Sequence, residues 1–209
     1  AAIKNGSYGK LMKAYYAKQD AEKLSGKGDT SQKLTLMKTS ADSLKKSADA
    51  LNDSSLWEKK KIKKKDEKTG EEIAVEDYDW DKITKAVKSF VEDYNDVVRE
   101  AGESNTKDVL RNASWMTGMT DKNSNMLAKI GITIGKGNKL ELDEDALKQA
   151  DISSLKTIFT GYNSFVSKIS QKATGISNAA NRASATYTNN GTYSKTDSSL
   201  TSSKIDKEV

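Results

Sequence analysis

Residues 126–147, MLAKIGITIGKGNKLELDEDAL, decide the predicted fold of the second half of the chain. Within them, residues 132–134 and 139–142 alternate apolar and polar side chains on either side of the tetrapeptide GKGN at 135–138. Two short alternating runs around a Gly/Asn-rich turn predict a β-hairpin. The acidic run DED at 143–145 follows directly, where an N-cap and the positive end of a helix dipole favour carboxylates. The stretch therefore predicts a hairpin held tightly between two helices.

Three other stretches, 29–53, 79–102 and 161–188, repeat apolar residues at alternating spacings of three and four. This spacing predicts a helical bundle or coiled coil. The repeating positions are Leu34, Met37, Ala41, Leu44, Ala48 and Leu51; Ile83, Val87, Phe90, Tyr94, Val97 and Ala101; and Tyr162, Phe165, Ile169, Ala173, Ile176, Ala180, Ala183 and Tyr187. Stretches 7–25 and 105–130 predict two further helices with less regular apolar faces. Each face is either bundle core or a seam that partly meets another subunit.

The third heptad stretch suggests where a second subunit could bind. Its apolar positions, among them Phe165, Ala173 and Ile176, continue to Tyr187, beside a polar tail with no core of its own to cover them. Small side chains in such a face let another helix approach closely. We therefore expect this face to be available for assembly.

The composition suits elongated helices. Hydrophobic residues make up 35% of the 209 and charged residues 31%, which is lean for a thick globular core and fits a narrow apolar seam. The chain contains no proline, so long helices are not interrupted. It also contains no cysteine and no histidine, which excludes disulfides, thiolate ligands and the commonest general base. No apolar run reaches the length of about 18 residues that a membrane span needs.

The segment 56–76 predicts a second, highly charged hairpin. Six lysines occupy 59–65 and eight acids occupy 66–81. They are Lys59, Lys60, Lys61, Lys63, Lys64 and Lys65, and then Asp66, Glu67, Glu71, Glu72, Glu76, Asp77, Asp79 and Asp81. One interpretation is a polyanion-binding strand for nucleic acid or anionic lipid. The other is charge neutralisation across a solvated ribbon, which the neighbouring acids and the lack of arginine favour. A lysine-rich strand also protects an edge against unwanted pairing.

Motifs that could carry catalysis are better explained as structure. Gly135 and Gly137 lie between two predicted strands, whereas phosphate-binding glycines lead from a strand into a helix. The acids at 143–145 lack the spacing and the central glycine of a calcium loop. Ser43 and Lys46 fit an S-x-x-K pattern, but they lie inside a heptad helix. We therefore predict no catalytic, cofactor-binding or metal-binding residue, no small-molecule substrate and no enzymatic activity.

The predicted fold class is mainly α: an elongated helical bundle or coiled coil with two small β-hairpins. The helical domain is expected to span 1–188, with hairpins near 56–76 and 131–142. Residues 189–209 are rich in Ser, Thr and Asn and bury too little apolar surface to offset their ordering entropy, so they predict a flexible polar tail. Because the chain begins AAIKN, without Met or an apolar signal segment, we expect a fragment or a processed form.

Three motifs, in this order and spacing, resemble a known family. VKSFVEDYN at 87–95 precedes the unit at 126–147, and LKTIFTG at 155–161 follows it. Together they are similar to the C-terminal region of the flagellar filament-capping protein family, hook-associated protein 2. The resemblance covers roughly residues 80–190. Neither the β-rich head domains of that family nor a match over the first sixty residues is found, which indicates a shortened or divergent relative.

The resemblance implies a structural, self-assembling protein that acts through helix–helix packing. Its partners would be copies of itself and/or flagellin-like axial proteins, and its location would be extracellular, on the bacterial flagellum or the cell surface. Two alternatives stay open. The first is a secreted or surface interaction module that retains the fold without a flagellar role. The second is a polyanion-binding module that uses the lysines of 59–65, although the balancing acids make nucleic acid an unfavourable partner.

Overall fold

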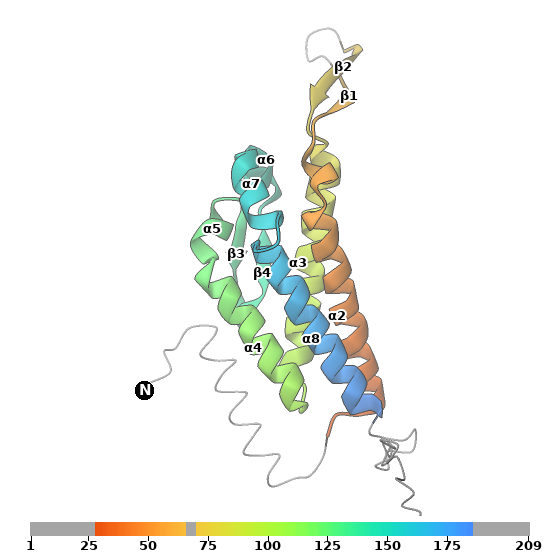
Figure 1. Cartoon of the computed structure of the whole chain (residues 1–209). Coiled ribbons are helices and arrows are strands. Elements are labelled where there is room, and N and C mark those ends of the chain that lie inside the picture. Colours follow the sequence, from red (N-terminus) through yellow and green to blue (C-terminus); the bar gives the residue numbers. More distant parts are fainter. Residues whose placement is uncertain (1–27, 66–69, 186–209) are drawn as a thin grey trace, which may run out of the picture.

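The computed structural model describes residues 28–65 and 70–185, which form a long helical bundle with two small antiparallel hairpins (Figure 1). The predicted fold class is therefore confirmed. The helix predicted at 7–25 and the tail predicted at 189–209 lie outside the described residues. The division of the chain between a helical domain and a tail stays a prediction.

Within the described residues, four helices form the bundle, and each runs antiparallel to the one before it (Figure 1). They are α2 (Ser31–Asn52), α3 (Trp80–Gly102), α4 (Lys107–Lys122) and α8 (Phe165–Ala185). Helix α2 contacts both α3 and α8, and α4 completes the bundle against α8 and α3. Side-chain caps start the first two helices, because the side chains of Thr30 and Asp79 accept hydrogen bonds from the amides of Lys33 and Lys82.

Two connections carry the remaining elements. The 3-10 helix η1 (Ser54–Trp57) and the strands β1 (Lys60–Lys65) and β2 (Glu72–Asp77) join α2 to α3. Between α4 and α8 lie α5 (Ser124–Ala128), β3 (Ile132–Ile134), η2 (Lys136–Asn138), β4 (Leu140–Leu142), α6 (Glu144–Gln149) and α7 (Ile152–Phe159). The β1–β2 ribbon projects beyond the end of the bundle, whereas the β3–β4 hairpin lies against its side (Figure 1).

The predicted heptad faces form the core. Of the heptad positions that the structure describes, all are buried except Tyr162 and Ala183. Aromatic rings join four elements at one end of this core. Trp57 stacks on Phe159 at 5.5 Å between ring centroids, and Phe90 meets Phe159 and Phe165 edge-on at 6.5 and 6.3 Å. These rings fix η1, α3, α7 and α8 to one another through their large buried area.

The expectation that Tyr162 belongs to the last heptad helix was wrong. Tyr162 is 83% exposed, because α8 begins only at Phe165. Gly161 has a φ of +98°, which ends the preceding segment in the left-handed region. The Ser164 hydroxyl then accepts a hydrogen bond from the amide of Ser167 at 3.2 Å and starts the helix there.

The expectation that the face of α8 around Ile176 is available to another subunit was also wrong. Ile176 and Ala173 are fully buried within the chain. The adjacent Ser177 donates a hydrogen bond to Asp42 of α2 at 2.6 Å, so α2 lies along this face. The sequence pattern described the face correctly, but it could not show that α2 covers it.

Two side-chain clamps spaced one heptad apart set the register of α2 against α8. Asp42 accepts hydrogen bonds from Lys38 and Ser177, each at 2.6 Å. Seven residues further along α2, Asp49 accepts from Lys45 and, at 2.7 Å, from Ser170, which lies seven residues before Ser177 on α8. Because the helices are antiparallel, the repeat matches only in this register.

The single helix predicted over 105–130 is broken. Helix α4 ends at Lys122, and the short helix α5 follows at Ser124. The side-chain amide of Asn123 donates to the carbonyl oxygen of Met119 at 2.7 Å, in competition with the regular backbone pattern. The chain therefore turns at Asn123 and leads into the hairpin.

The hairpin predicted at 131–142 is confirmed, with Ile132 opposite Leu142 and Ile134 opposite Leu140. Its turn uses Gly137 at a φ of +76° and Asn138 at +65°, two residue types that tolerate the left-handed region. At the start of the hairpin, a Cβ added to Gly131 would lie 2.6 Å from the carbonyl oxygen of Asp143. Only glycine fits that approach.

Candidate interaction surfaces

The motif residues that carry the resemblance serve internal contacts. The Tyr94 hydroxyl donates to the Thr120 hydroxyl at 2.9 Å, in the buried space between α3 and α4. The Asn95 amide contacts both backbone groups of Leu140, accepting from its amide at 2.7 Å and donating to its carbonyl at 2.9 Å. Asn95 thus imitates a third strand beside β4 and fixes the hairpin to α3.

Further motif residues join α7 to the end of α2. Phe159 stacks on Trp57, and the amide of Gly161 donates to the Asn52 side-chain oxygen at 2.8 Å. Asp143 caps α6, as predicted, by accepting hydrogen bonds from the amides of Asp145 and Ala146. Gly135 and Gly137 belong to the hairpin turn, which is their predicted place between two strands.

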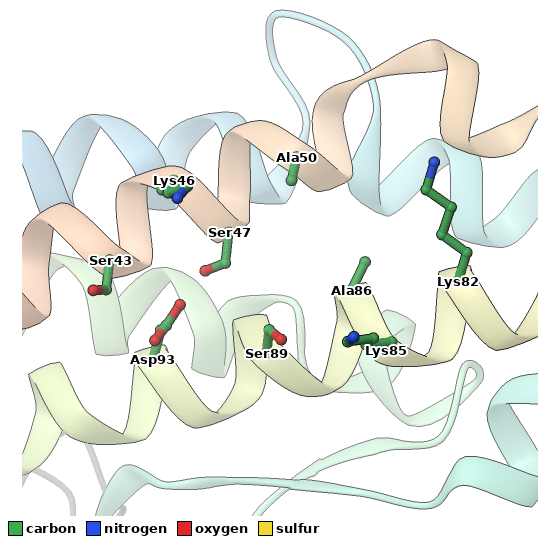
Figure 2. A pocket seen from close by; sticks show the side chains of 9 residues that line it. All are labelled: Ser43, Lys46, Ser47, Ala50, Lys82, Lys85, Ala86, Ser89 and Asp93. Atoms are coloured by element: carbon green, nitrogen blue, oxygen red, sulfur yellow. The ribbon is translucent and has the colours of Figure 1, made fainter.

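A groove of about 380 Å³ runs between α2 and α3 on the outer face of the bundle (Figure 2). Its lining residues are Ser43, Lys46, Ser47, Ala50, Lys82, Lys85, Ala86, Ser89 and Asp93. Small side chains follow a helical repeat on both walls: Ser43, Ser47 and Ala50 on α2, and Ala86 and Ser89 on α3. Small residues at such spacing permit close approach of a further helix.

Asp93 is the acidic residue of this groove. Figure 2 shows its carboxylate turned toward Ser47 across the groove. Partial burial raises the pKa of Asp93 above its ordinary value, and the negative charges of Asp96 and Glu92 add to the effect, while a hydrogen bond from Ser47 opposes it. The S-x-x-K residues Ser43 and Lys46 lie at the same groove, but on consecutive turns of a surface helix.

The β1–β2 ribbon is the second surface feature. Three of the five β1 lysines lie opposite an acid: Lys60 opposite Asp77, Lys61 opposite Glu76 and Lys65 opposite Glu72. Lys63 forms an ion pair with Glu72 at 3.2 Å. This arrangement agrees with the predicted charge neutralisation on a solvated ribbon.

The base of the ribbon is attached to the bundle through an aromatic side chain. The Lys59 and Lys156 amines lie 5.7 and 6.0 Å from the centroid of the Tyr78 ring. Lys59 lies just before β1, and Lys156 belongs to α7. Tyr78 also packs edge-on against Trp80 at 6.4 Å. Beyond this base the ribbon extends away from the helices (Figure 1).

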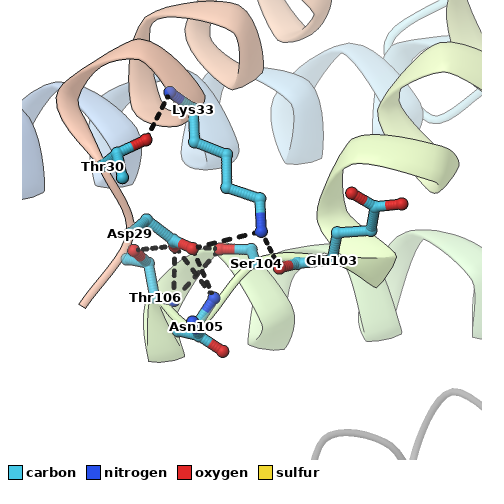
Figure 3. Close-up of polar contacts among 7 residues, drawn as sticks. All are labelled: Asp29, Thr30, Lys33, Glu103, Ser104, Asn105 and Thr106. Atoms are coloured by element: carbon cyan, nitrogen blue, oxygen red, sulfur yellow. Dashed lines mark hydrogen bonds and ion pairs between the residues drawn. The ribbon is translucent and has the colours of Figure 1, made fainter. Parts of the chain in front are cut away.

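One buried carboxylate was missed by sequence reasoning. Asp29, only 6% exposed, ties the start of α2 to the loop between α3 and α4 (Figure 3). It accepts hydrogen bonds from the hydroxyls of Ser104 and Thr106 at 2.6 and 2.7 Å and from the amides of Asn105 and Thr106. Burial by itself would raise the pKa of Asp29, yet these hydrogen bonds together hold it below the ordinary value. A polar residue just before a heptad stretch was the available signal, but its partners are distant in sequence.

Two of the three arginines, which lie far apart in the sequence, meet in space. Arg111 and Arg182 both contact Asp108, at 2.8 and 3.6 Å. Nearby on the same pair of helices, Trp115 is 59% exposed, and the Lys172 amine lies 5.5 Å from its ring centroid. The carboxylate of Asp108 offsets one of the two guanidinium charges, and its contact with Arg182 links α4 to α8.

The part of the chain that the structure describes contains neither a cluster of metal-binding side chains nor a membrane-spanning helix. Within residues 28–65 and 70–185, no three acidic side chains are arranged so that they could hold a metal ion. No helix in these same ranges combines the length and the apolarity needed to cross a bilayer.

The fold and its contacts define a helical bundle protein in which motif residues serve packing. Residues 103–208, just over half of the chain, match the family model described as the flagellar hook-associated protein 2 C-terminus. The chain therefore belongs to the flagellar hook-associated protein 2 family. No curated protein matches the chain, and neither does any solved structure. Membership of this family indicates a structural role of the flagellar cap type.

Proposed function

We propose that this protein is an extracellular structural subunit that associates with copies of itself and with flagellin-like axial proteins. The family match over residues 103–208 carries the proposal. The contacts of the family motifs support it, because Tyr94, Asn95 and Phe159 all stabilise the bundle. A subunit of an assembly needs such a rigid body more than it needs a reactive site.

The groove between α2 and α3 is the proposed contact for a partner helix. Apart from Tyr162 and Ala183, the heptad positions that the structure describes are buried within the chain, so these faces are not available for such a contact. The groove instead offers small residues at helical spacing on two neighbouring helices, with Ala50 on one wall and Ala86 on the other. A third helix packed there would bury apolar area without moving the existing core.

A bulky charge in the groove tests this function. Ala50→Arg places the charge on an exposed position of α2, so the fold should be kept. Ala128→Arg, at an exposed position of α5, is the matched control. We expect Ala50→Arg to weaken self-association or flagellin binding by about tenfold or more, a loss of about 1.4 kcal/mol. Sedimentation over a wide concentration range measures self-association, and pull-down with flagellin measures flagellin binding.

Three results would count against the proposal. A wild-type protein that stays monomeric and binds no flagellin would contradict it altogether. Self-association without any binding to flagellin would instead indicate a surface interaction module outside the flagellum. Equal effects of Ala50→Arg and Ala128→Arg would remove the groove as the contact and leave the assembly role intact.

A further inference from the structure

The β1–β2 ribbon has two strand edges that carry opposite charge. Among the described residues, each strand pairs only with the other, so each presents one open edge of backbone donors and acceptors. Every charged residue of β1 is a lysine, and every charged residue of β2 is an acid. On β2 these are Glu72, Glu76 and Asp77. The ribbon is therefore basic along one edge and acidic along the other.

The two faces of the ribbon also differ. Ile62 lies opposite Val75, and Ile73 lies two residues from Val75 on the same face. Ile62 and Val75 are half-buried, while Ile73 is 42% exposed. The same face also carries Lys60 opposite Asp77, and the other face carries Lys61 opposite Glu76. A two-stranded ribbon with a partly exposed aliphatic face is marginally stable alone and gains stability when further strands join it.

We propose that the basic β1 edge of one copy pairs with the acidic β2 edge of a second copy, which extends the ribbon into a sheet between subunits. This inference rests on the proposed self-assembly and names one surface for it. Lysines of one copy would face carboxylates of the next across the new strand pair, where opposite charges stabilise cross-strand neighbours. If all copies have the same orientation, β2 of one copy lies antiparallel to β1 of the next. The aliphatic faces of all copies then lie on the same side of the sheet.

The charge pattern also selects the symmetry of the contact. A two-fold contact would place β1 against β1 or β2 against β2, and both pairings bring like charges together. Only the head-to-tail pairing of β1 with β2 joins opposite charges. Head-to-tail contacts generate rings when the rotation closes and open filaments when it does not. The lysines thus prevent indiscriminate edge pairing and still permit one complementary partner.

A charge-swapped variant tests the pairing directly. It exchanges the signs of both strands and so keeps lysine opposite acid within each ribbon. Its substitutions are Lys60→Glu, Lys61→Glu, Lys63→Glu, Lys64→Glu, Lys65→Glu, Glu72→Lys, Glu76→Lys and Asp77→Lys. The ribbon projects beyond the bundle, so far-UV circular dichroism and cooperative thermal unfolding should match those of the wild type.

The wild type and the charge-swapped variant should each self-associate, but they should not associate with each other. A mixed contact would set lysine edges against lysine edges and acidic edges against acidic edges. We expect mixed association, followed by energy transfer between differently labelled proteins, to be about tenfold or more weaker than association of either protein with itself. Self-association of both should weaken as salt is raised, because the side chains of Lys61, Lys63 and Glu76 are exposed.

Four results would overturn the inference. Free mixing of the two proteins would place the contact on another surface, and the proposed function would stand. Preferred mixed association would indicate a two-fold contact between like edges. Salt-sensitive retention on heparin by a wild type that does not self-associate would indicate a polyanion-binding ribbon. A monomeric wild type that binds flagellin would exclude ribbon pairing and leave the flagellar role in place.

Discussion

The α2–α8 helix pair and the β1–β2 ribbon are both antiparallel pairs with regularly spaced charges, yet the charges serve different purposes. In the helix pair, Asp42 and Asp49 bind serine hydroxyls at the margin of a seam in which Ala41 and Ala48 are fully buried. In the ribbon, Lys63 and Glu72 meet with side chains 79% and 58% exposed. Apolar burial holds the helices together and charge only sets their register, whereas the ribbon has little besides hydrogen bonds and charge.

This difference predicts where the molecule is sensitive to change. Substitutions in the bundle should alter the free energy of unfolding, because each buried side chain contributes both transfer and packing terms. Substitutions in the ribbon should alter association and leave folding almost unchanged, since exposed ion pairs contribute little.

The largest expected effect is that of Ile176→Asp. Ile176 is fully buried between α8 and its neighbours, so the substitution places a carboxylate where the apolar seam offers no compensating charge. We expect a loss of more than about 4 kcal/mol in the free energy of unfolding, or failure to fold. Asn178→Asp, at an exposed position of the same helix, is the control and should be near neutral. Chemical denaturation measures both. A stably folded Ile176→Asp protein that only fails to self-associate would restore α8 as a contact surface.

Phe90→Ala should have the second-largest effect on the free energy of unfolding. Phe90 is fully buried and meets Tyr94, Phe159 and Phe165 at centroid distances between 6.3 and 6.5 Å. Removing the ring should cost about 3–5 kcal/mol through the lost transfer energy and the cavity that remains. Glu92→Ala, an exposed position of α3, serves as the control in the same denaturation experiment. A loss below about 1 kcal/mol would mean that the aromatic cluster can collapse into the space.

Features that depend on the local periodicity of apolar side chains or on local turn and cap residues could be predicted from the sequence. The heptads placed Phe90, Tyr94 and Val97 in the core, and all three are fully buried. Alternation around GKGN placed the hairpin and its turn, because side-chain period and turn chemistry are both local. The cap at Asp143 followed from the same kind of signal.

Features that depend on distant partners could not be predicted. Ile176 looked uncovered because the pattern of α8 alone does not show that α2 lies on it. Asp29 looked unremarkable because its partners at 104–106 are more than seventy residues away. The proposed contact surfaces show the same limit: the groove joins Ala50 to Ala86 from two helices, and no single stretch of sequence contains its pattern.

Asp29→Asn should have an intermediate effect that depends on pH. Because the pKa of Asp29 is lowered in the folded protein, the ionised carboxylate stabilises the fold at neutral pH. The substitution should cost about 1.5–3 kcal/mol there, the range for hydrogen bonds to a charged group. As pH falls below about 3.9, the ordinary value in an unfolded chain, the wild type should progressively lose this contribution and the difference should shrink. Thermal unfolding from pH 7 to pH 3 measures it; a constant difference would show that the charge does not matter.

The smallest effect on stability is expected from substitutions of the lysines in and beside the β1–β2 ribbon, although the charge density is highest there. Replacing Lys59, Lys61, Lys63 and Lys65 by Gln removes four positive charges from one side of the ribbon. Exposed ion pairs contribute on the order of 0–1 kcal/mol each, and the contact of Lys59 with the Tyr78 ring adds a similar amount. Since the ribbon base is also held by Tyr78 and Trp80, we expect the midpoint of thermal unfolding to change little.

Measuring self-association of the same variant should distinguish the role of the ribbon from that of the bundle. With three of the five β1 lysines neutralised, self-association through β1 and β2 should weaken, while the bundle unfolds as before. The matched control removes four exposed lysines elsewhere, Lys122, Lys129, Lys136 and Lys148, and should leave self-association unchanged. Sedimentation and differential scanning calorimetry on both variants give the comparison. Loss of cooperative unfolding in the ribbon variant would show that the ribbon packs as part of the core, and unchanged self-association would show that its charges do not guide assembly.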